Sequence, residues 1–224
     1  MKRIVVFTGA GISAESGLAT FRDSGGLWEK HKIDDVATPK AFIKNPDLVL
    51  KFYNIRRKQL STIKPNVAHI SLNRLSAKYK LSIVTQNIDD LHERSGSKNV
   101  LHLHGKLTEA RSTKTNKVYP INYKELNIGD LCENGFQLRP NVVWFGEQVP
   151  NMNKAIKKVS HAHIMIIIGT SLNVYPAASL LNYANKAKRI ILIEPKGVKM
   201  NDIEVIKEKA TKAVPLLIDE LLMN

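Results

Sequence analysis

Arg3-Ile-Val-Val-Phe-Thr8 runs directly into Gly9-Ala-Gly-Ile-Ser-Ala-Glu-Ser-Gly17, and this stretch decides the fold. Its first part is short, apolar and rich in β-branched residues, which predicts a buried strand. Glycines at 9 and 11 would let backbone N–H groups approach a pyrophosphate, and a helix start behind them would add unpaired donors and a positive dipole end. The spacing is not Gly-x-Gly-x-x-Gly, so it is the position of the glycines after a strand that favours nucleotide binding.

Strand signals alternate with helical stretches along the rest of the chain. This alternation predicts an α/β fold, with a Rossmann-like doubly wound parallel sheet and a small inserted domain. The expected strands cover 3–8, 81–86, 100–104, 141–145, 163–168 and 189–193. Asn45 can cap a helix that Pro46 opens and that runs to Leu60. Further helices are expected over 176–187, 202–210 and 215–223.

The segment 105–140 is polar, rich in turn residues and poor in periodicity, which indicates an inserted small module. A second insertion is expected at about 24–64. We therefore expect a single catalytic domain over 1–224, with the two insertions forming its small part. The large part would cover about 1–23, 65–104 and 141–224.

The charge of the chain and its distribution indicate which classes of binding partner to expect. The net charge of +14 would attract polyanions in general. The lysines are spread along the sequence, however, without interleaved aromatic residues or a nucleic-acid-binding motif. We therefore expect a solvated basic surface suited to anionic ligands and no nucleic-acid partner, with a polyanion partner as the alternative.

Cys132 is the only cysteine, which excludes an internal disulfide and any site built from several thiolates. The longest later apolar run, over 164–168, is too short to span a membrane, and the first residues enter a strand pattern rather than a signal peptide. We expect a soluble, cytoplasmic, monomeric protein with no membrane partner.

Polar side chains follow two of the expected strands where each ends. Gln86, Asn87 and Asp89 come after the strand at 81–86, and His102 and His104 close the strand at 100–104. Ligands of open α/β sheets bind outside the carboxyl ends of the strands, so this grouping indicates a reaction centre. The alternative for the first three residues is ordinary helix capping and turn chemistry.

Several blocks of the chain occur in the order and spacing of one known family. They are Gly9-Ala-Gly-Ile-Ser-Ala-Glu-Ser-Gly17 with Thr20-Phe-Arg22, Thr85-Gln-Asn-Ile-Asp89, His102-Leu-His-Gly105, Asn141-Val-Val-Trp-Phe-Gly-Glu147 and Gly169-Thr-Ser-Leu-Asn-Val174. Together they resemble the sirtuin family of NAD-dependent protein lysine deacylases over nearly the whole chain. The resemblance implies a cleft between the two parts of the fold, where NAD and an acylated-lysine protein or peptide meet.

The resemblance also implies roles for residues. Cofactor contacts fall on Gly9, Ala10, Gly11, Glu15, Thr20, Phe21, Arg22, Trp28, Gln86, Asn87, Ile88, Asp89, Gly169, Thr170, Ser171 and Ala210. In sirtuins the acyl oxygen attacks the ribose carbon that carries nicotinamide. His104 would then take a ribose hydroxyl proton as catalytic base, while Asn87 and Asp89 orient the nicotinamide amide and a water. Phe21 would shield the reactive carbon.

The same resemblance places the substrate. Val143, Phe145, Gly146 and Glu147 would accept the peptide as an added strand, with Phe145 packing on the lysine stem. Tyr53 and Arg56, on one face of the expected helix, resemble the Tyr-x-x-Arg pair of sirtuins that remove succinyl and malonyl groups. Thr20 and Ala19 resemble the same group. The alternative is a basic solvated helix face, because Arg57 and Lys58 adjoin the pair.

The chain departs from the family in two places. Most sirtuins hold a structural zinc with two Cys-x-x-Cys pairs, and Cys132 alone cannot form that site. We expect no zinc, and we expect local packing to replace it around Val118, Tyr119, Ile121, Leu126, Leu131 and Phe136. Leu192 stands where relatives often place a ribose-binding asparagine. Ala210 is expected against the adenine.

The prediction is therefore an NAD-dependent deacylase that removes succinyl, malonyl and acetyl groups from lysine and forms nicotinamide and 2'-O-acyl-ADP-ribose. Three alternatives stay open. The enzyme could be a general lysine deacetylase, or it could consume NAD as an ADP-ribosyltransferase or NAD hydrolase. The third alternative is a non-catalytic binder of NAD or of polyanions.

Overall fold

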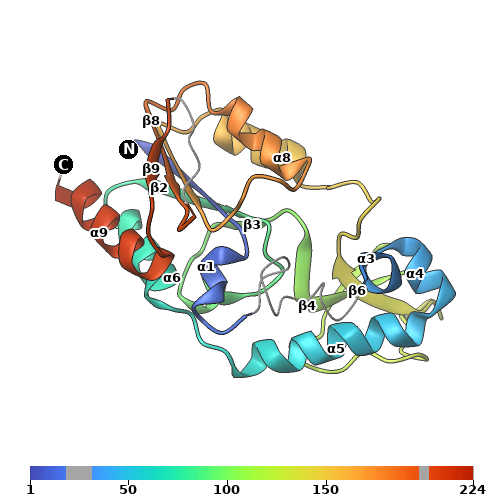
Figure 1. Ribbon diagram of the computed structural model, residues 1–224. Coiled ribbons are helices and arrows are strands. Elements are labelled where there is room, and N and C mark those ends of the chain that lie inside the picture. Colours follow the sequence, from blue (N-terminus) through green and yellow to red (C-terminus); the bar gives the residue numbers. More distant parts are fainter. Residues whose placement is uncertain (19–31, 197–201, 224) are drawn as a thin grey trace.

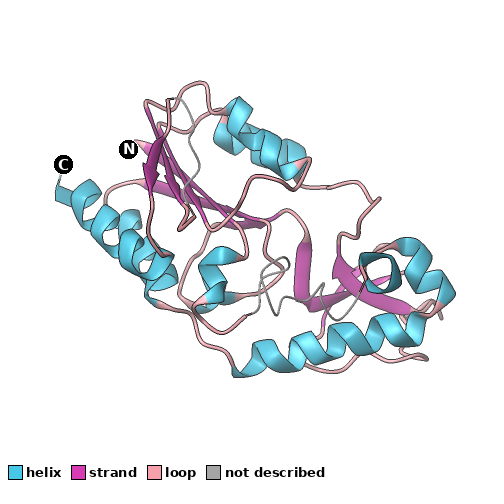
Figure 2. Cartoon of the chain, in the orientation of Figure 1, coloured by secondary structure: helices cyan, strands magenta, loops and turns pink. Residues whose placement is uncertain are grey.

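The computed structural model describes residues 1–18, 32–196 and 202–223. Its centre is a six-stranded parallel sheet in the order β3-β2-β1-β7-β8-β9 (Figures 1 and 2). The strands are β1 Arg3–Thr8, β2 Lys80–Thr85, β3 Val100–His102, β7 Ile164–Ile168, β8 Arg189–Ile193 and β9 Glu204–Ile206. The order reverses between β1 and β7, so the sheet is doubly wound and the predicted fold class is confirmed.

Helices cover both faces of this sheet. Alternate residues of β1 point to opposite faces, so Ile4 and Val6 pack in one core cluster and Val5 and Phe7 in another. The first cluster includes α6 Val67–Leu72, η1 Asn73–Ala77 and α9 Ala210–Met223, and the second includes α8 Met152–Val159 and η2 Ala177–Tyr183. Burial on both faces explains why the strands read as continuous apolar runs.

A small domain lies beside the large sheet. It contains an antiparallel sheet in the order β5-β4-β6, formed by β4 Gly105–Ser112, β5 Val118–Pro120 and β6 Leu138–Val142. Its helices are α3 Ile33–Val36, α4 Pro39–Lys44 and α5 Pro46–Thr62 (Figure 1). The two short helices α1 Gly11–Ala14 and α7 Leu91–Arg94 follow β1 and β2.

The long helix α5 begins where the sequence predicts. The Asn45 side chain accepts a hydrogen bond from the Leu48 N–H at 3.1 Å, and Pro46 occupies the first helical position. The helix then buries Val49, Phe52 and Leu60 against the small-domain core. Burial along this face fixes which side chains of α5 point toward the large sheet.

Four expected elements differ from the structure. The strand expected at 141–145 ends at Val142 and belongs to the antiparallel sheet, because Gly105 pairs with Val142 there. The helix expected at 202–210 is the strand β9, whose β-branched residues complete the parallel sheet. The last helix starts at Ala210 and carries Pro215 inside it, and the helix expected at 176–187 is a shorter 3₁₀ helix.

The packing that holds the small domain differs in part from the expectation. Leu126 and Cys132 are buried with Leu50, Ala110 and Leu138, and Tyr119 and Ile121 pack against them. Val118, Leu131 and Phe136 are exposed, so their expected place in this core is wrong. Polar contacts also join the segments, because Cys132 Sγ lies 3.5 Å from Ser112 Oγ and Glu133 binds both Lys117 and Tyr119.

Candidate active site

Two glycine loops meet where the strand order reverses. The Gly9 N–H donates to the Ile168 carbonyl at 3.0 Å, and the Gly11 N–H donates to the Gly169 carbonyl at 2.9 Å. A Cβ on Gly11 would stand 2.6 Å from the Gly169 Cα, and Gly169 itself has a φ of 63°. Only glycine allows this contact between the loops. The result is a side-chain-free backbone surface where the two loops meet, at the carboxyl edge of the sheet.

A cleft of about 850 Å³ lies at this edge and extends to the small domain. The structure gathers most of the predicted site residues along its walls. Those that line it are Gly9, Ala10, Gly11, Glu15, Tyr53, Arg56, Gln86, Asn87, Ile88, His104, Val143, Phe145, Gly146, Glu147, Gly169, Thr170, Ser171 and Ala210. The predicted Thr20, Phe21, Arg22 and Trp28 lie outside the described residues.

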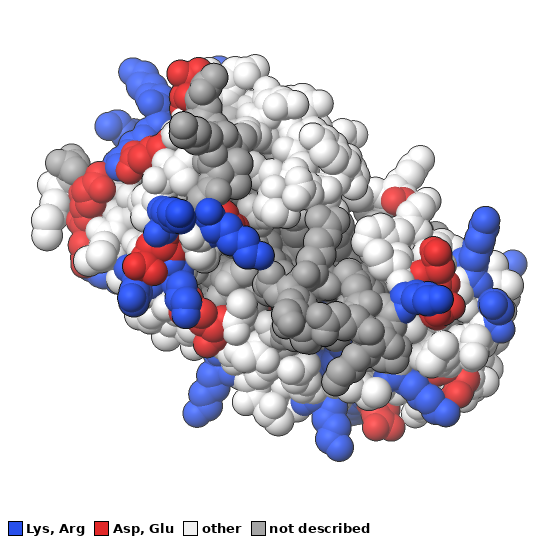
Figure 3. Space-filling view, viewed as in Figure 1, with Lys and Arg blue, Asp and Glu red and all other residues white. Residues whose placement is uncertain are grey.

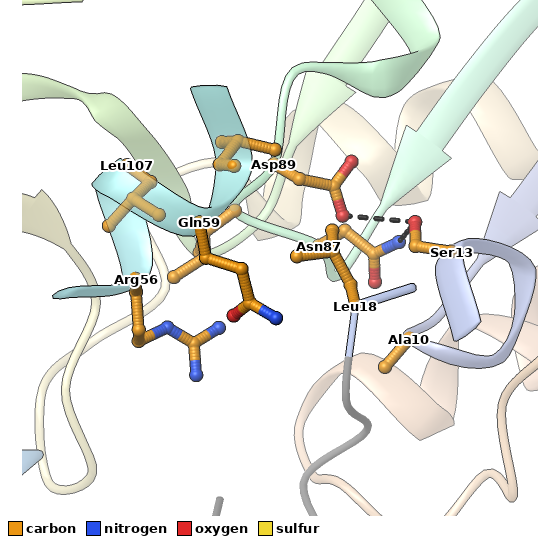
Figure 4. A pocket seen from close by; sticks show the side chains of 10 residues that line it. Ala10, Ser13, Leu18, Arg56, Gln59, Asn87, Asp89 and Leu107 are labelled. Carbon is orange, nitrogen blue, oxygen red and sulfur yellow. Dashed lines mark hydrogen bonds between the residues drawn. The ribbon is translucent and has the colours of Figure 1, made fainter. Parts of the chain in front are cut away.

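Asp89 lines a smaller hollow that shares Ala10, Arg56 and Asn87 with the cleft (Figure 4). The Ser13 hydroxyl donates to Asp89 Oδ2 at 3.0 Å and accepts from Asn87 Nδ2 at 3.2 Å. Burial raises the pKa of Asp89, against the opposing hydrogen bonds from Leu91 and Ser13. Ser13 thus fixes both predicted side chains, and sequence reasoning gave it no role although it stands in the glycine-rich loop.

Two buried histidines lie behind this hollow. His69 Nε2 is 3.5 Å from Ser13 Oγ, and the rings of His69 and His92 are 5.0 Å apart. Burial lowers the pKa of His69 to about 4 and that of His92 to about 3. Both rings are therefore neutral near pH 7 and place no positive charge beside Asp89. Sequence reasoning missed them because only the fold brings 13, 69 and 92 together.

His104 is oriented by a backbone contact. Its Nδ1 lies 3.0 Å from the Gln86 carbonyl oxygen, which can only accept, so Nδ1 carries the hydrogen. In the neutral ring Nε2 is then the unprotonated nitrogen. Burial lowers the pKa of His104, and the bond to Gln86 opposes this shift. The ring can thus accept a proton at Nε2 near neutral pH.

His102 is not among the residues that line the cleft. Its Nδ1 contacts the Asn87 carbonyl at 2.9 Å and its Nε2 contacts Glu93 Oε1 at 2.8 Å. Burial raises the pKa of Glu93, but the hydrogen bonds and charges of His102 and Lys106 lower it to about 2. Glu93 is therefore ionised, and both ring nitrogens of His102 face acceptors. The two histidines of this segment thus hold the consecutive carbonyls of Gln86 and Asn87.

Tyr53 and Arg56 lie one turn apart on α5 and both line the cleft. Trp144 Nε1 donates to the Tyr53 hydroxyl at 3.0 Å. Burial raises the pKa of Tyr53 to about 12, against the opposing charge of Arg56, so the phenol keeps its hydrogen. Burial also lowers the pKa of Arg56, against the charges of Tyr53 and Asp89.

The alternative of a solvated basic face on α5 is wrong for Arg57. This side chain is fully buried, and its Nε donates to the Leu107 carbonyl at 2.9 Å while Nη1 donates to Asn54 Oδ1 at 2.7 Å. Arg57 thus ties α5 to β4. Lys58 is exposed, so only that neighbour of the pair behaves as a solvated cation.

The segment 143–147 forms a turn. The Val143 N–H donates to the His104 carbonyl at 2.9 Å, Gly146 has a φ of 90°, and the Trp144 N–H donates to Glu147 Oε2 at 2.8 Å. Glu147 also binds Arg111 and Arg139. The expected strand there is wrong, and the carboxylate of Glu147 stabilises the turn. Phe145 remains 47% exposed on the cleft wall.

At the opposite end of the cleft, Glu15 binds the N–H and the hydroxyl of Thr211 at 3.1 and 2.7 Å, which joins α1 to the start of α9. Gln86 Nε2 donates to Thr170 Oγ1 at 3.0 Å. Leu192 is 1% exposed and belongs to the core, so it offers nothing to a ribose.

Within residues 1–18, 32–196 and 202–223, His, Cys, Asp and Glu side chains form no group of three or more that could hold a metal ion. In the same ranges, every helix is too short or too polar to cross a membrane.

The chain is similar to known proteins along almost its whole length. A model of the Sir2 family matches residues 9–176. The chain is 51% identical over 226 residues to an "NAD-dependent protein deacylase" of Helicobacter pylori strain J99, covering 99% of this chain and 96% of the relative. It is 47% identical over 224 residues to a protein of the same name from Bacteroides thetaiotaomicron, covering 96% and 95%.

Solved structures agree with the sequence relatives. A mutant Sir2 homologue in complex with ADP ribose superimposes with a TM-score of 0.92 at 37% identity, covering 99% of this chain and 92% of that one. A Sir2 homologue in complex with NAD gives 0.89 at 38% identity, covering 99% and 90%. With the glycine loops, the cleft and the His104 segment in place, these matches show that the chain belongs to the Sir2 family of NAD-dependent protein deacylases.

Proposed function

We propose that this enzyme removes succinyl and malonyl groups from lysine side chains of proteins, that it retains deacetylation, and that it forms nicotinamide and 2'-O-acyl-ADP-ribose. The observation that supports it most is the shared cleft: Tyr53 and Arg56 line the same walls as His104. An acyl-lysine that reaches His104 would present the far end of its acyl group to α5.

The chemistry of the pair suits a carboxylate. A guanidinium can bind a carboxylate through two parallel hydrogen bonds, and desolvation strengthens that interaction. Tyr53 accepts from Trp144 and keeps its own hydrogen, because its pKa is about 12. It would therefore donate to the second oxygen of the same carboxylate. An acetyl group is shorter and uncharged, so it would use neither contact.

NAD fits the described residues. Gly9, Gly11 and Gly169 would let its pyrophosphate approach the backbone of the two loops closely, because none of them carries a side chain there and a Cβ at any of them would clash with the neighbouring loop. When bound, NAD supplies a ribose carbon with nicotinamide as its leaving group. Asn87 and Asp89 would orient the nicotinamide amide, and Ser13 holds both side chains for that purpose.

His104 would act after the acyl oxygen has replaced nicotinamide. Its Nε2 would take a proton from a ribose hydroxyl, and the bond to Gln86 keeps that nitrogen unprotonated. Phe145 would pack on the lysine stem, and the backbone of 143–147 would contact the peptide. The other predicted cofactor and substrate contacts, and the division into the large and small parts with the bounds predicted above, belong to the same proposal.

The test compares succinyl-lysine, malonyl-lysine and acetyl-lysine peptides of one sequence with NAD, with products followed by mass spectrometry. Arg56→Met should lower kcat/KM for the acidic acyl groups about 10- to 100-fold, because hydrogen bonds to charged groups are each worth roughly 1.5–3 kcal/mol. Acetyl-lysine turnover should change little. His104→Ala should abolish all three reactions, and Lys58→Met on the same helix is the matched control.

Other outcomes have definite meanings. Equal or better deacetylation that Arg56→Met leaves unchanged identifies a general deacetylase. Free ADP-ribose or ADP-ribosylated protein without acyl-ADP-ribose identifies an NAD hydrolase or an ADP-ribosyltransferase. Either result removes the acidic-acyl proposal.

A further inference from the structure

The strands of the parallel sheet begin with cations. We call this group of side chains the basic edge, and it lies at the amino ends of the strands, opposite the cleft. Its members are Lys2, Arg3, Lys78, Lys80, Lys98, Lys157, Lys158, Lys186 and Lys188, with His161 and His163 between them. Blue side chains project at the upper left of Figure 3, around the N-terminus and the start of β8 in Figure 1.

The fold places these residues side by side although they are far apart in sequence. Arg3 pairs with Lys80 in the register of β1 and β2. The Lys80 N–H donates to the Lys2 carbonyl at 2.9 Å, and the Lys188 N–H donates to the His163 carbonyl at 2.9 Å. In the sequence these lysines look evenly spread, because parallel strands bring their first residues together only after folding.

The loop before β3 joins the same edge. Lys158 Nζ donates to Asn99 Oδ1 at 3.0 Å and lies 3.4 Å from Ser82 Oγ. Lys158 therefore bridges the end of α8 to the starts of β2 and β3. Burial and the nearby charge of Lys80 lower the pKa of Lys158.

Carboxylates neutralise this edge only in part. Within the described ranges, the ion pairs of this region involve Arg189, which binds Glu204 and Glu220 at the β8–β9 end. In the same ranges, none of the lysines of the basic edge nor Arg3 lies within ion-pair distance of an acidic side chain. The edge therefore carries a concentrated positive field on a chain of net charge +14.

We propose that the basic edge binds the phosphate backbone of duplex nucleic acid. Adjacent strands are roughly 4.8 Å apart, so the five strand starts from β3 to β8 span about 19 Å. That span exceeds the roughly 12 Å width of the major groove, so lysines reach phosphates on both of its sides. Contacts of this kind are independent of sequence.

The residues of the basic edge suit duplex nucleic acid better than an anionic membrane or a single strand. In the segments that form the basic edge, all of them described, Met1 is the one large apolar side chain that is exposed. A membrane-binding face needs a continuous apolar side, and single strands need aromatic rings for stacking. The basic edge offers exposed ammonium groups, such as those of Lys80 and Lys98, which match phosphates. Because the cleft lies at the opposite ends of the strands, binding leaves it open to NAD and peptide.

The test uses the full chain and a labelled random-sequence DNA duplex, with the dissociation constant measured by fluorescence anisotropy from 50 to 200 mM salt. The edge variant is Lys80→Glu/Lys98→Glu/Lys157→Glu. The matched control, Lys40→Glu/Lys44→Glu/Lys58→Glu, makes the same charge change at exposed lysines of α4 and α5. Removing one lysine–phosphate interaction lowers the slope of log K against log salt by about 0.9.

We expect wild type and control to bind alike, and we expect the edge variant to bind at least 10-fold more weakly with a slope lower by about 2 to 3. Deacylation by all three proteins should be unchanged, which separates this result from the fate of the proposed acyl specificity. Equal weakening by the two triple variants would reduce the effect to net charge and overturn the proposal. Absence of wild-type binding at 50 mM salt, or binding of anionic vesicles in preference to the duplex, would overturn it as well. Lys→Gln versions of the edge variant check that glutamate has not disturbed folding.

Discussion

His104 Nδ1 and the backbone oxygen of Gln86 lie 3.0 Å apart, and this contact determines which nitrogen of the His104 ring is free to take a proton. Because the carbonyl can only accept, the unprotonated nitrogen is Nε2.

Deacylation should depend on pH through His104. A general base works in its neutral form, and burial lowers the pKa of His104 below its ordinary value of 6.5. The rate should therefore rise with pH along an acidic limb whose midpoint lies below 6.5, and it should be flat by pH 7. The profile of kcat/KM against pH measures this midpoint, and a midpoint at or above 6.5 would contradict the assignment.

His102 should act as a positioning residue for the loop that carries Asn87. In His102→Asn the amide can still donate to the Asn87 carbonyl, whereas the longer side chain in His102→Gln reaches toward Glu93 instead. We expect the asparagine variant to keep most activity and the glutamine variant to lose about 10-fold, since one hydrogen bond to the loop is worth roughly 1.5 kcal/mol. Steady-state kinetics with varied NAD should place the loss in kcat. Equal losses in the two variants, with matching losses in thermal stability, would indicate a merely structural role.

Protein stability should fall as the pH drops from 7 to 5. His69 and His92 stay neutral in the folded protein, with pKa values of about 4 and about 3, while the unfolded chain binds protons from pH 6.5 downward. The free energy of unfolding therefore falls by roughly 1.4 kcal/mol per pH unit below 6.5 for each ring, or about 4 kcal/mol in all at pH 5. Urea unfolding at the two pH values measures this loss.

A variant separates the contribution of the histidines to this loss of stability from the contribution of the carboxylates. Glu93 keeps its charge down to a pKa of about 2, so its contribution is lost only at pH values below 4.5. Burial raises the pKa of Asp89, which acts in the opposite direction as the pH falls. His92→Gln should therefore reduce the loss between pH 7 and 5 by about 2 kcal/mol, the share of one ring, and an unchanged loss would show that other groups cause it.

The small domain should fold without zinc. Ser112, Cys132 and Glu133 join its segments through hydrogen bonds, and Leu126 fills its core. Untagged protein should contain zinc far below stoichiometry, and EDTA should leave Tm unchanged. Leu126→Ala should cost about 2–5 kcal/mol of unfolding free energy. Stoichiometric zinc that resists dialysis would contradict this prediction.

Local sequence signals predicted the parts of the fold that depend on local structure. The strand before Gly9 and the helix that Asn45 caps are of this kind, because alternation, capping and proline placement act within a few residues. Position along the sheet edge also brought Asn87 and His104 to the cleft. The family resemblance supplied the assignment of Tyr53 and Arg56.

Other features depend on contacts that sequence order does not show. The turn at 143–147 is held by Arg111 and Arg139 from neighbouring strands, so its residues looked like a strand. Ser13 meets His69 only after the sheet forms, and the basic edge exists only because parallel strands align their first residues. β9 was read as a helix because its short apolar pattern suits either structure.

The contact between Trp144 and Tyr53 has a consequence for inhibitor design. The backbone N–H of Trp144 donates to Glu147, and its ring packs against Phe42 with ring centroids 5.3 Å apart. Because Trp144 is held in this way and donates to the Tyr53 hydroxyl, that hydroxyl has a fixed neighbour before any ligand arrives. A ligand that meets a rigid wall loses less side-chain entropy on binding. A short scaffold with a terminal carboxylate should therefore gain affinity from rigidity in its own linker, since the wall it meets need not rearrange.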